Sequence, residues 1–87
     1  MNILIVDDSA PILKLLEKSM QRWGHETQTA QTGKAAMDIV TRTFFDLILL
    51  DIYLPDAIAH EHIPKFKRQW SGMDIITMTG HSTSEIE

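Results

Sequence analysis

The sequence predicts an α/β fold in which helices cover both faces of a parallel β-sheet. Short apolar runs, typical of strands buried on both faces, alternate with segments whose apolar residues recur at helical spacing. Four strands and three helices are expected, in alternation from the first strand onward. Because this alternation implies parallel pairing with right-handed crossovers, the expected architecture is a three-layer sandwich.

The expected strands differ in how apolar they are. Asn2–Val6 is a short run rich in β-branched residues and Leu, and residues 45–51 are the most apolar of the four, which favours a central position. Residues 25–30 are polar and rich in Thr, which indicates an edge strand. Residues 73–79 form the fourth expected strand.

The first helix is expected between Pro11 and Gly24. Ser9 is a suitable N-cap, Pro11 fits the first turn, and Gly24 fits the position just after the helix. Helical spacing assigns the inward face of this helix to six residues, Ile12, Leu15, Leu16, Ser19, Met20 and Trp23.

Two more helices are expected before the fourth strand. The first covers residues 33–42, and the second ends at Trp70. Spacing assigns their inward faces to Ala36, Ile39 and Val40 in the first and to Ile63, Phe66 and Trp70 in the second. Proline inside a helix removes a hydrogen bond and clashes with the preceding turn. The second helix is therefore expected either to begin late, with Pro64 in its first turn, or to be kinked.

Composition narrows the class of protein. Twelve acidic and eight basic residues give a net charge of −4, so the basic surface of a nucleic-acid-binding domain is missing. The absence of cysteine excludes a disulfide framework and a zinc site built from thiolates. The longest apolar runs are about four residues, too short for a membrane span or a secretory signal. We therefore expect a small, acidic, cytoplasmic domain.

Three carboxylates stand at the ends of expected strands. Asp7 and Asp8 follow the first strand, and Asp51 ends the third. Ligands of open α/β sheets bind beyond the carboxyl ends of the strands, so these side chains converge if the two strands are neighbours. Carboxylates this close together repel one another and destabilise the site unless a cation is bound, and hard oxygen ligands favour Mg²⁺. With the hydroxyl of Thr79 from the end of the fourth strand, the set suits phosphoryl transfer.

Three segments at these strand ends resemble the signature segments of a known family. Residues 3–9 (ILIVDDS), 46–55 (DLILLDIYLP) and 75–81 (IITMTGH) are similar to those of the receiver domain of two-component response regulators. The resemblance implies a flavodoxin-like fold with strand order 2-1-3-4. It also implies that residues 1–87 are a receiver domain incomplete at its C-terminus, without the fifth strand and last helix. Residues 82–85 match a capping box, which predicts one further helix start.

The resemblance also implies roles for the acids. Asp51 would be the phosphoacceptor, receiving its phosphoryl group from the phosphohistidine of a histidine kinase or phosphotransfer protein. Asp8, Asp51 and the backbone carbonyl of Tyr53 would ligate Mg²⁺ directly. Asp7 would act mainly through a metal-bound water.

Two residues after the fourth strand would contact the phosphoryl group. Thr79 would hydrogen-bond the phosphoryl oxygens and report their presence by reorienting. The small Gly80 would leave access to the site and offer its backbone N–H. The family's phosphate-pairing lysine and its switch aromatic belong to the fifth strand, beyond Glu87.

The expected function is a phosphorylatable switch with no enzyme activity beyond its own phosphorylation and dephosphorylation. Two other functions are possible for these residues. A Mg²⁺-dependent phosphohydrolase with an Asp nucleophile requires a second acid two residues later to protonate the leaving group. Here position 53 is Tyr and the next acid is Asp56. The second alternative is a truncated receiver that serves interaction or dimerisation without phosphate. Residues 75–78 are apolar, uncharged and free of proline, which predicts a homodimer through the fourth strand or by exchanged termini.

Overall fold

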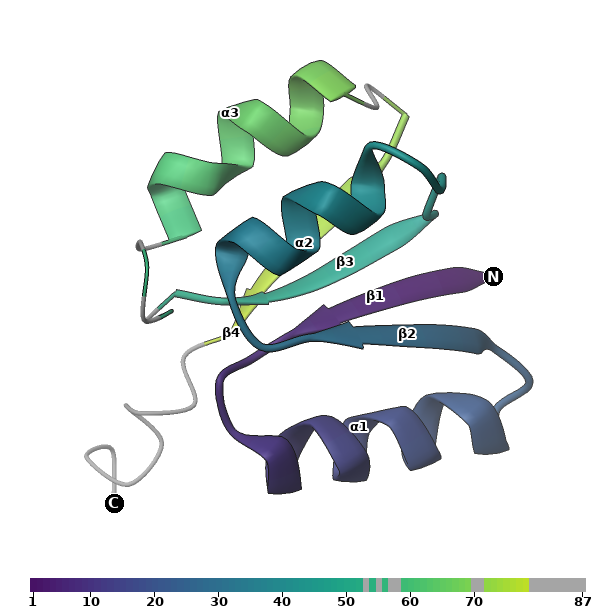
Figure 1. The fold of residues 1–87 in the computed structure, drawn as a ribbon. Helices are drawn as coiled ribbons and strands as arrows, with labels where there is room; N and C mark the ends of the chain where they lie inside the picture. Colours follow the sequence, from purple (N-terminus) through teal and green to yellow (C-terminus); the bar gives the residue numbers. More distant parts are fainter. Residues whose placement is uncertain (53, 55, 57–58, 70–71, 79–87) are drawn as a thin grey trace.

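The fold is a parallel β-sheet with helices on both faces, seen in a computed structural model (Figure 1). The structure describes residues 1–52, 54, 56, 59–69 and 72–78. Within this part the sheet has the order β2-β1-β3-β4, and every neighbouring pair is parallel. The strands are β1 (Asn2–Val6), β2 (Glu26–Ala30), β3 (Leu47–Asp51) and β4 (Asp74–Met78). The predicted strand order and the edge position of β2 are confirmed.

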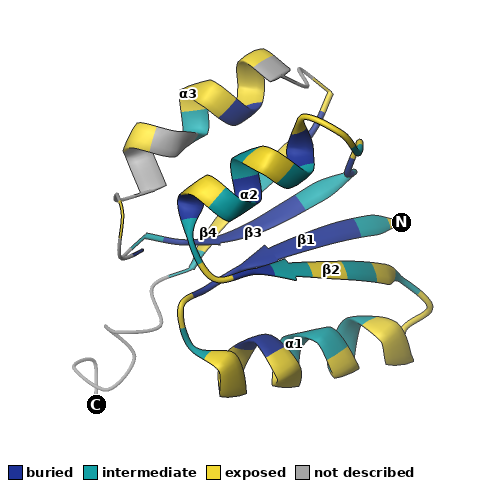
Figure 2. Cartoon of the chain, viewed as in Figure 1, coloured by how far each residue is buried: buried dark blue, intermediate teal, exposed yellow. Residues whose placement is uncertain are grey.

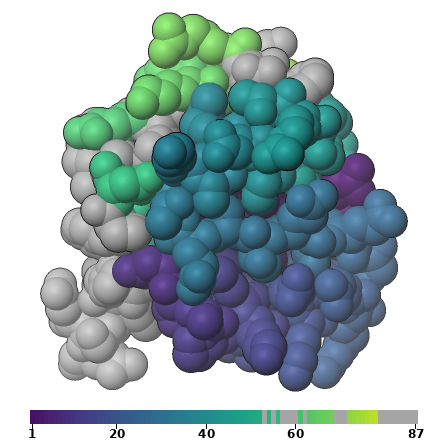
Figure 3. Space-filling model, in the orientation of Figure 1, coloured from purple at the N-terminus to yellow at the C-terminus, as the bar shows by residue number. Residues whose placement is uncertain are grey.

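The helices form the two outer layers. In the described residues they are α1 (Ala10–Arg22), α2 (Gly33–Val40) and α3 (Ala59–Gln69). Among the described helices, α1 lies on one face of the sheet, and α2 and α3 lie side by side on the other (Figure 1). In the space-filling view the purple and blue N-terminal part of the chain lies at the bottom and the green atoms of α3 lie at the top (Figure 3). The predicted three-layer, flavodoxin-like architecture is confirmed, whereas the predicted helix start at residues 82–85 lies outside the described residues. None of the described helices has the length and apolar content that crossing a membrane requires.

The ends of the first helix follow from local chemistry. Ser9 is its N-cap, and the Ser9 hydroxyl accepts a hydrogen bond from the Ile12 N–H at 3.4 Å. Gly24 ends the helix with a φ of +89°, a left-handed conformation that glycine adopts without the steric cost of a Cβ. The predicted cap and stop of α1 are both confirmed.

Two apolar clusters lie on the two faces of the sheet. The larger lies under α2 and α3, where Val6, Ile48 and Phe66 are fully buried. The smaller lies under α1 and is built from Ile3, Ile5, Leu13 and Leu49. Figure 2 shows the resulting contrast between the dark blue strands β1 and β3 and the yellow outer side of α1.

The predicted inward face of α1 is wrong in part. Leu13 is the buried residue of this helix, and Leu16 and Met20 pack beside it, so the contact stripe follows the spacing i, i+3, i+7. The remaining large apolar residues of the predicted face are exposed, namely Ile12 (37%), Leu15 (65%) and Trp23 (69%). The apolar stripe of α1 is broader than the sheet surface beneath it, and periodicity alone does not say which edge of such a stripe is covered.

The third helix departs from expectation at its proline. Pro64 lies in the interior of α3 and is exposed, so the expected late start with Pro64 in the first turn is wrong. Phe66, two residues later, is fully buried, and Ile63 packs against the same core as predicted. Burial of such side chains contributes about 1.5–3 kcal/mol each, which offsets the hydrogen bond that proline cannot make. The predicted inward Trp70 lies outside the described residues.

Candidate metal site at the carboxyl edge of the sheet

The register between β1 and β3 brings two acids to the same level of the sheet. Val6 is the pairing partner of Leu50, so Asp7 and Asp51 are the next residues on two adjacent parallel strands. On its other side Asp51 pairs with Met78, the last residue of β4. Asp51 therefore lies at the carboxyl edge between two neighbouring strands, where open α/β sheets bind ligands.

Backbone hydrogen bonds hold both acids in place. The N–H of Asp7 donates to the carbonyl of Ala30 at the end of β2, at 3.1 Å. The N–H of Ile52, next to Asp51, donates to the carbonyl of Met78 at 3.1 Å. Both strand ends are thus fixed to their neighbours before any ligand binds.

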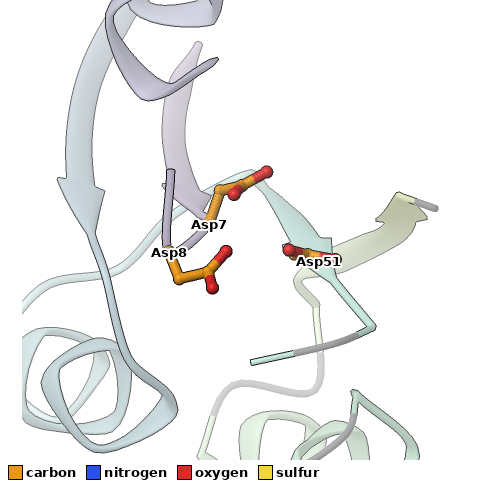
Figure 4. Close-up of side chains that lie close together, drawn as sticks. All are labelled: Asp7, Asp8 and Asp51. Carbon is orange, nitrogen blue, oxygen red and sulfur yellow. The ribbon is translucent and has the colours of Figure 1, made fainter. Parts of the chain in front are cut away.

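Asp7, Asp8 and Asp51, here called the acidic cluster, form a set of oxygen ligands. Each offers a carboxylate oxygen, and these oxygens all lie within 4.8 Å of one another. Asp7 (3% exposed) and Asp51 (1%) are buried, whereas Asp8 is exposed. Figure 4 shows Asp7 and Asp8 together at the end of β1 and Asp51 across from them, with the carboxylates of Asp8 and Asp51 turned toward each other.

The electrostatics of Asp7 reflect this crowding. Burial raises the pKa of its carboxyl above the usual value, and the nearby charges of Asp51 and Asp8 raise it further. The N–H of Ser9 donates to Asp7 Oδ1 at 2.9 Å and opposes this rise in pKa. A bound cation would relieve the repulsion, and a small set of hard oxygen ligands at one edge fits Mg²⁺.

The structure brings together the three acids that the sequence singled out. The expectation that Asp7 and Asp8 would meet Asp51 at adjacent strand ends is confirmed by the geometry. Tyr53, Thr79 and Gly80, the other predicted site residues, lie outside the described residues.

Sequence reasoning missed the position of Asp56. Its Oδ1 accepts the N–H of Gly33 at 2.9 Å, and its Oδ2 accepts the N–H of Lys34 at 2.8 Å. A carboxylate near a helix N-terminus is favoured by the helix dipole, but the helix in question is 22 residues earlier in the chain. The available signal was an acid in a loop next to the candidate site, with nothing to say which helix it would meet.

Fold and acidic cluster together define a class, the parallel α/β proteins with acids at the carboxyl edge of the sheet, the edge where open α/β sheets bind ligands. The model of the response regulator receiver domain family matches residues 3–87. The chain belongs to this family, the receiver domains of two-component signalling.

Two curated relatives resemble the chain over different shares of their length. Sporulation initiation phosphotransferase F of Bacillus subtilis is 37% identical over 79 residues, covering 91% of this chain and 64% of that protein. A probable cyclic di-GMP phosphodiesterase of Vibrio cholerae is 32% identical over 87 residues, covering 98% of this chain and 20% of that protein. The chain thus spans less than two thirds of the length of either relative.

Solved structures agree with the fold. A CheY-like receiver domain protein from Methanospirillum hungatei has a TM-score of 0.89 and 34% identity, with 97% of this chain and 67% of that chain covered. The response regulator TrrA of Thermotoga maritima in complex with Mg²⁺-BeF has a TM-score of 0.83 and 31% identity, with 98% and 76% covered. TrrA in complex with the histidine kinase ThkA has a TM-score of 0.85 and 32% identity, with 93% and 70% covered.

Proposed function

We propose that the chain is a phosphorylatable switch in which Asp51 accepts a phosphoryl group from a phosphohistidine. The observation that carries this proposal is the position of Asp51. It is almost fully buried at the end of β3 and shares the carboxyl edge with Asp7 and Asp8. Membership of the receiver family supports this role for the acid at that strand end.

The transfer step balances with Asp51 as the nucleophile. An oxygen of its ionised carboxylate attacks the phosphorus, an O–P bond forms, and the N–P bond to the donor imidazole breaks. The electron pair of the broken bond stays on the imidazole nitrogen, which takes a proton from solvent. The attacking carboxylate carries no proton, so this step needs no general base.

The acidic cluster would hold Mg²⁺ for this transfer. Asp8 and Asp51, with the backbone carbonyl of Tyr53, are the proposed direct ligands, and Asp7 would act through a bound water. When bound, Mg²⁺ would neutralise the charge that gathers on the phosphoryl oxygens. The spacing of the carboxylate oxygens, all within 4.8 Å, and the raised pKa of Asp7 support a cation at this place.

Thr79 and Gly80 are proposed to contact the transferred group. Thr79 would donate its hydroxyl hydrogen bond to a phosphoryl oxygen, and Gly80 would offer its backbone N–H. Both follow Met78, which pairs with Asp51 across β3 and β4. This pairing supports a place for them at the same edge.

The proposed donor is a histidine kinase or a phosphotransfer protein, and the proposed location is the cytoplasm. The similarity to TrrA, solved in complex with the kinase ThkA, supports the choice of donor. We propose no enzyme activity beyond self-phosphorylation and self-dephosphorylation. Tyr stands two residues after Asp51, at the position where a phosphohydrolase with an Asp nucleophile requires its general acid.

Self-association through β4 is a further part of the proposal. In the described part of the chain β4 is hydrogen-bonded to β3 alone, and Ile76 is 53% exposed. An apolar edge of this kind is a template for pairing with a second copy. Sedimentation at micromolar concentration should show a dimer that Ile76→Lys disrupts, and a wild-type monomer would contradict this part of the proposal.

The central test is phosphate uptake from a small phosphodonor. Incubation with acetyl phosphate and Mg²⁺ should add about 80 Da, one phosphoryl group, and the adduct should map to Asp51. Asp51→Asn should abolish the adduct. Asp46→Asn is the matched control, because Asp46 directly precedes β3, at the end opposite Asp51, and accepts the Asn2 N–H at 2.8 Å. An unmodified wild type, or an adduct that persists in Asp51→Asn, would overturn the proposal.

A further inference from the structure

The segment that follows Asp51 is fastened to the start of α2. Asp56 makes this attachment through both carboxylate oxygens, which accept the N–H groups of Gly33 (2.9 Å) and Lys34 (2.8 Å). The two bonds join parts of the chain that are 23 and 22 residues apart. They are charge-assisted, which makes them roughly twice as strong as bonds between neutral groups.

These bonds satisfy two backbone donors at the N-terminus of α2. The first four N–H groups of a helix, counted from its N-cap, have no partner within it. In α2 the carbonyl of the N-cap Thr32 accepts the first helical hydrogen bond, from Ala36 at 3.1 Å, so the N–H groups of Gly33, Lys34 and Ala35 are among those that need other acceptors. The Thr32 side chain accepts the N–H of Ala35 at 3.0 Å, and the two oxygens of Asp56 accept those of Gly33 and Lys34. Asp56 therefore caps α2 from a distant part of the chain, and in doing so it ties the segment after Asp51 to this helix.

The same segment is held at two points nearer to the acidic cluster. Ile52 donates its N–H to the carbonyl of Met78 at 3.1 Å. Leu54 is buried (6% exposed) in the larger apolar cluster under α2 and α3. Among the described residues of this segment, Asp56 makes a third attachment. In sequence, Tyr53 stands between the first two, and its carbonyl is one of the proposed Mg²⁺ ligands.

We propose that Asp56 is a positioning residue for the metal site, locking the segment after Asp51 against α2. This inference rests on the proposed binding of Mg²⁺ at the acidic cluster. A carbonyl that ligates a metal contributes most to the affinity when its backbone is already held in the binding geometry. Otherwise part of the binding free energy is lost in ordering the backbone. By thermodynamic linkage the effect is reciprocal, and Mg²⁺ binding should tighten the bonds from Gly33 and Lys34 to Asp56.

The test measures Mg²⁺ affinity and the amide signals of Gly33 and Lys34 in the intact chain. Isothermal titration with MgCl₂ should show that Asp56→Ala binds Mg²⁺ about fivefold or more weakly than wild type. Asp56→Asn should lie between the two, since its carbonyl oxygen can replace one acceptor but not both. In ¹⁵N–¹H spectra, Mg²⁺ should shift both amide signals in wild type and increase their protection from hydrogen exchange. Neither change should occur in Asp56→Ala.

Two control variants separate positioning from general stability. Asp46→Ala removes a comparable bond, from the Asn2 N–H to a carboxylate, at the opposite end of the sheet. Thr32→Ala weakens the N-terminus of α2 but leaves the bonds to Asp56. Both should keep the wild-type affinity for Mg²⁺ within about twofold, even where they lower the melting temperature.

Each outcome decides between the proposals. Equal Mg²⁺ affinity in wild type and Asp56→Ala would overturn the inference alone, as would a loss shared by Asp46→Ala and Thr32→Ala. If Asp56→Ala does not fold, the comparison is made between wild type and Asp56→Asn. Amide signals of Gly33 and Lys34 that do not change when Mg²⁺ is added to wild type would then overturn the inference. A wild type that binds no Mg²⁺ would overturn the proposed metal site and the inference together.

Discussion

Val6 of β1 is paired with Leu50 of β3, and this single register places Asp7 beside Asp51. Side chains alternate between the faces of a strand, so a slip of one residue would turn every side chain of β1 to the opposite face. Val6 and Leu50 are fully buried in the same apolar cluster, which fixes the register. The core thus determines which acids meet at the carboxyl edge.

Mg²⁺ should stabilise the folded chain, because the folded state alone assembles the acidic cluster. At a Mg²⁺ concentration ten times the dissociation constant, the free energy of unfolding should rise by about 1.4 kcal/mol. For a domain of this size that corresponds to roughly 5–10 °C in melting temperature. Thermal unfolding followed by circular dichroism, with and without Mg²⁺, measures the shift. Asp8→Asn should lose it and Asp46→Asn should keep it, whereas an equal shift in both variants would point to Mg²⁺ bound elsewhere.

Asp7→Asn should stabilise the metal-free chain near neutral pH. Burial and the charges of Asp51 and Asp8 raise the pKa of Asp7 in the folded state. As pH rises, the unfolded chain loses this proton first, so the free energy of unfolding falls between the ordinary carboxyl pKa of about 3.9 and the raised one. Asparagine has no such proton, and its carbonyl oxygen can still accept the Ser9 N–H. At a pH above the raised pKa of Asp7, and with a chelator present, the urea midpoint of Asp7→Asn should therefore be higher than that of wild type.

The pH profile checks the cause of this gain. Below about pH 3.9 Asp7 is protonated in both states, so the advantage of Asp7→Asn should vanish there. Added Mg²⁺ should favour wild type and reduce the advantage at neutral pH. A gain that persists unchanged into acid would show that the repulsion within the acidic cluster is not its source.

The sequence predicts the strands and the three acids well, since both depend on features that are local in the chain, whereas the strand order follows from the resemblance of three segments to the receiver family. Apolar runs mark the strands, and each acid directly follows or ends such a run. The role of Asp56 could not be predicted in this way, because its partners Gly33 and Lys34 belong to an element 22 or 23 residues away. Helical periodicity likewise gives the apolar stripe of α1 but not the part of it that the sheet covers.

A pair of leucines in α1 tests which part of that stripe is buried. Leu13 is 6% exposed and packs on Ile3, Ile5 and Leu49, whereas Leu15 is 65% exposed. Leu13→Ala should lower the free energy of unfolding by about 2–4 kcal/mol, through lost burial and the cavity left behind. Leu15→Ala should change it by no more than about 0.5 kcal/mol. Urea unfolding of the two variants measures the difference, and equal losses would contradict the observed packing of α1.

Pro64→Ala should stabilise the chain, because the proline lies inside α3. Alanine restores a backbone N–H donor, removes the clash with the preceding turn and has a helix propensity about 3 kcal/mol more favourable than that of proline. Proline also restricts the unfolded chain, which offsets part of this difference. The expected gain is therefore about 1–3 kcal/mol in the free energy of unfolding. Urea unfolding monitored by far-UV circular dichroism gives the value.

Lys65→Ala is the matched control for this substitution, since Lys65 is the next residue of α3 and is also exposed. It restores no hydrogen bond, so its effect should stay within about 0.5 kcal/mol. A loss of stability in Pro64→Ala would mean that the proline ring makes a contact worth more than the hydrogen bond it costs. Since Pro64 is exposed while Phe66 anchors the helix in the core, we expect the opposite.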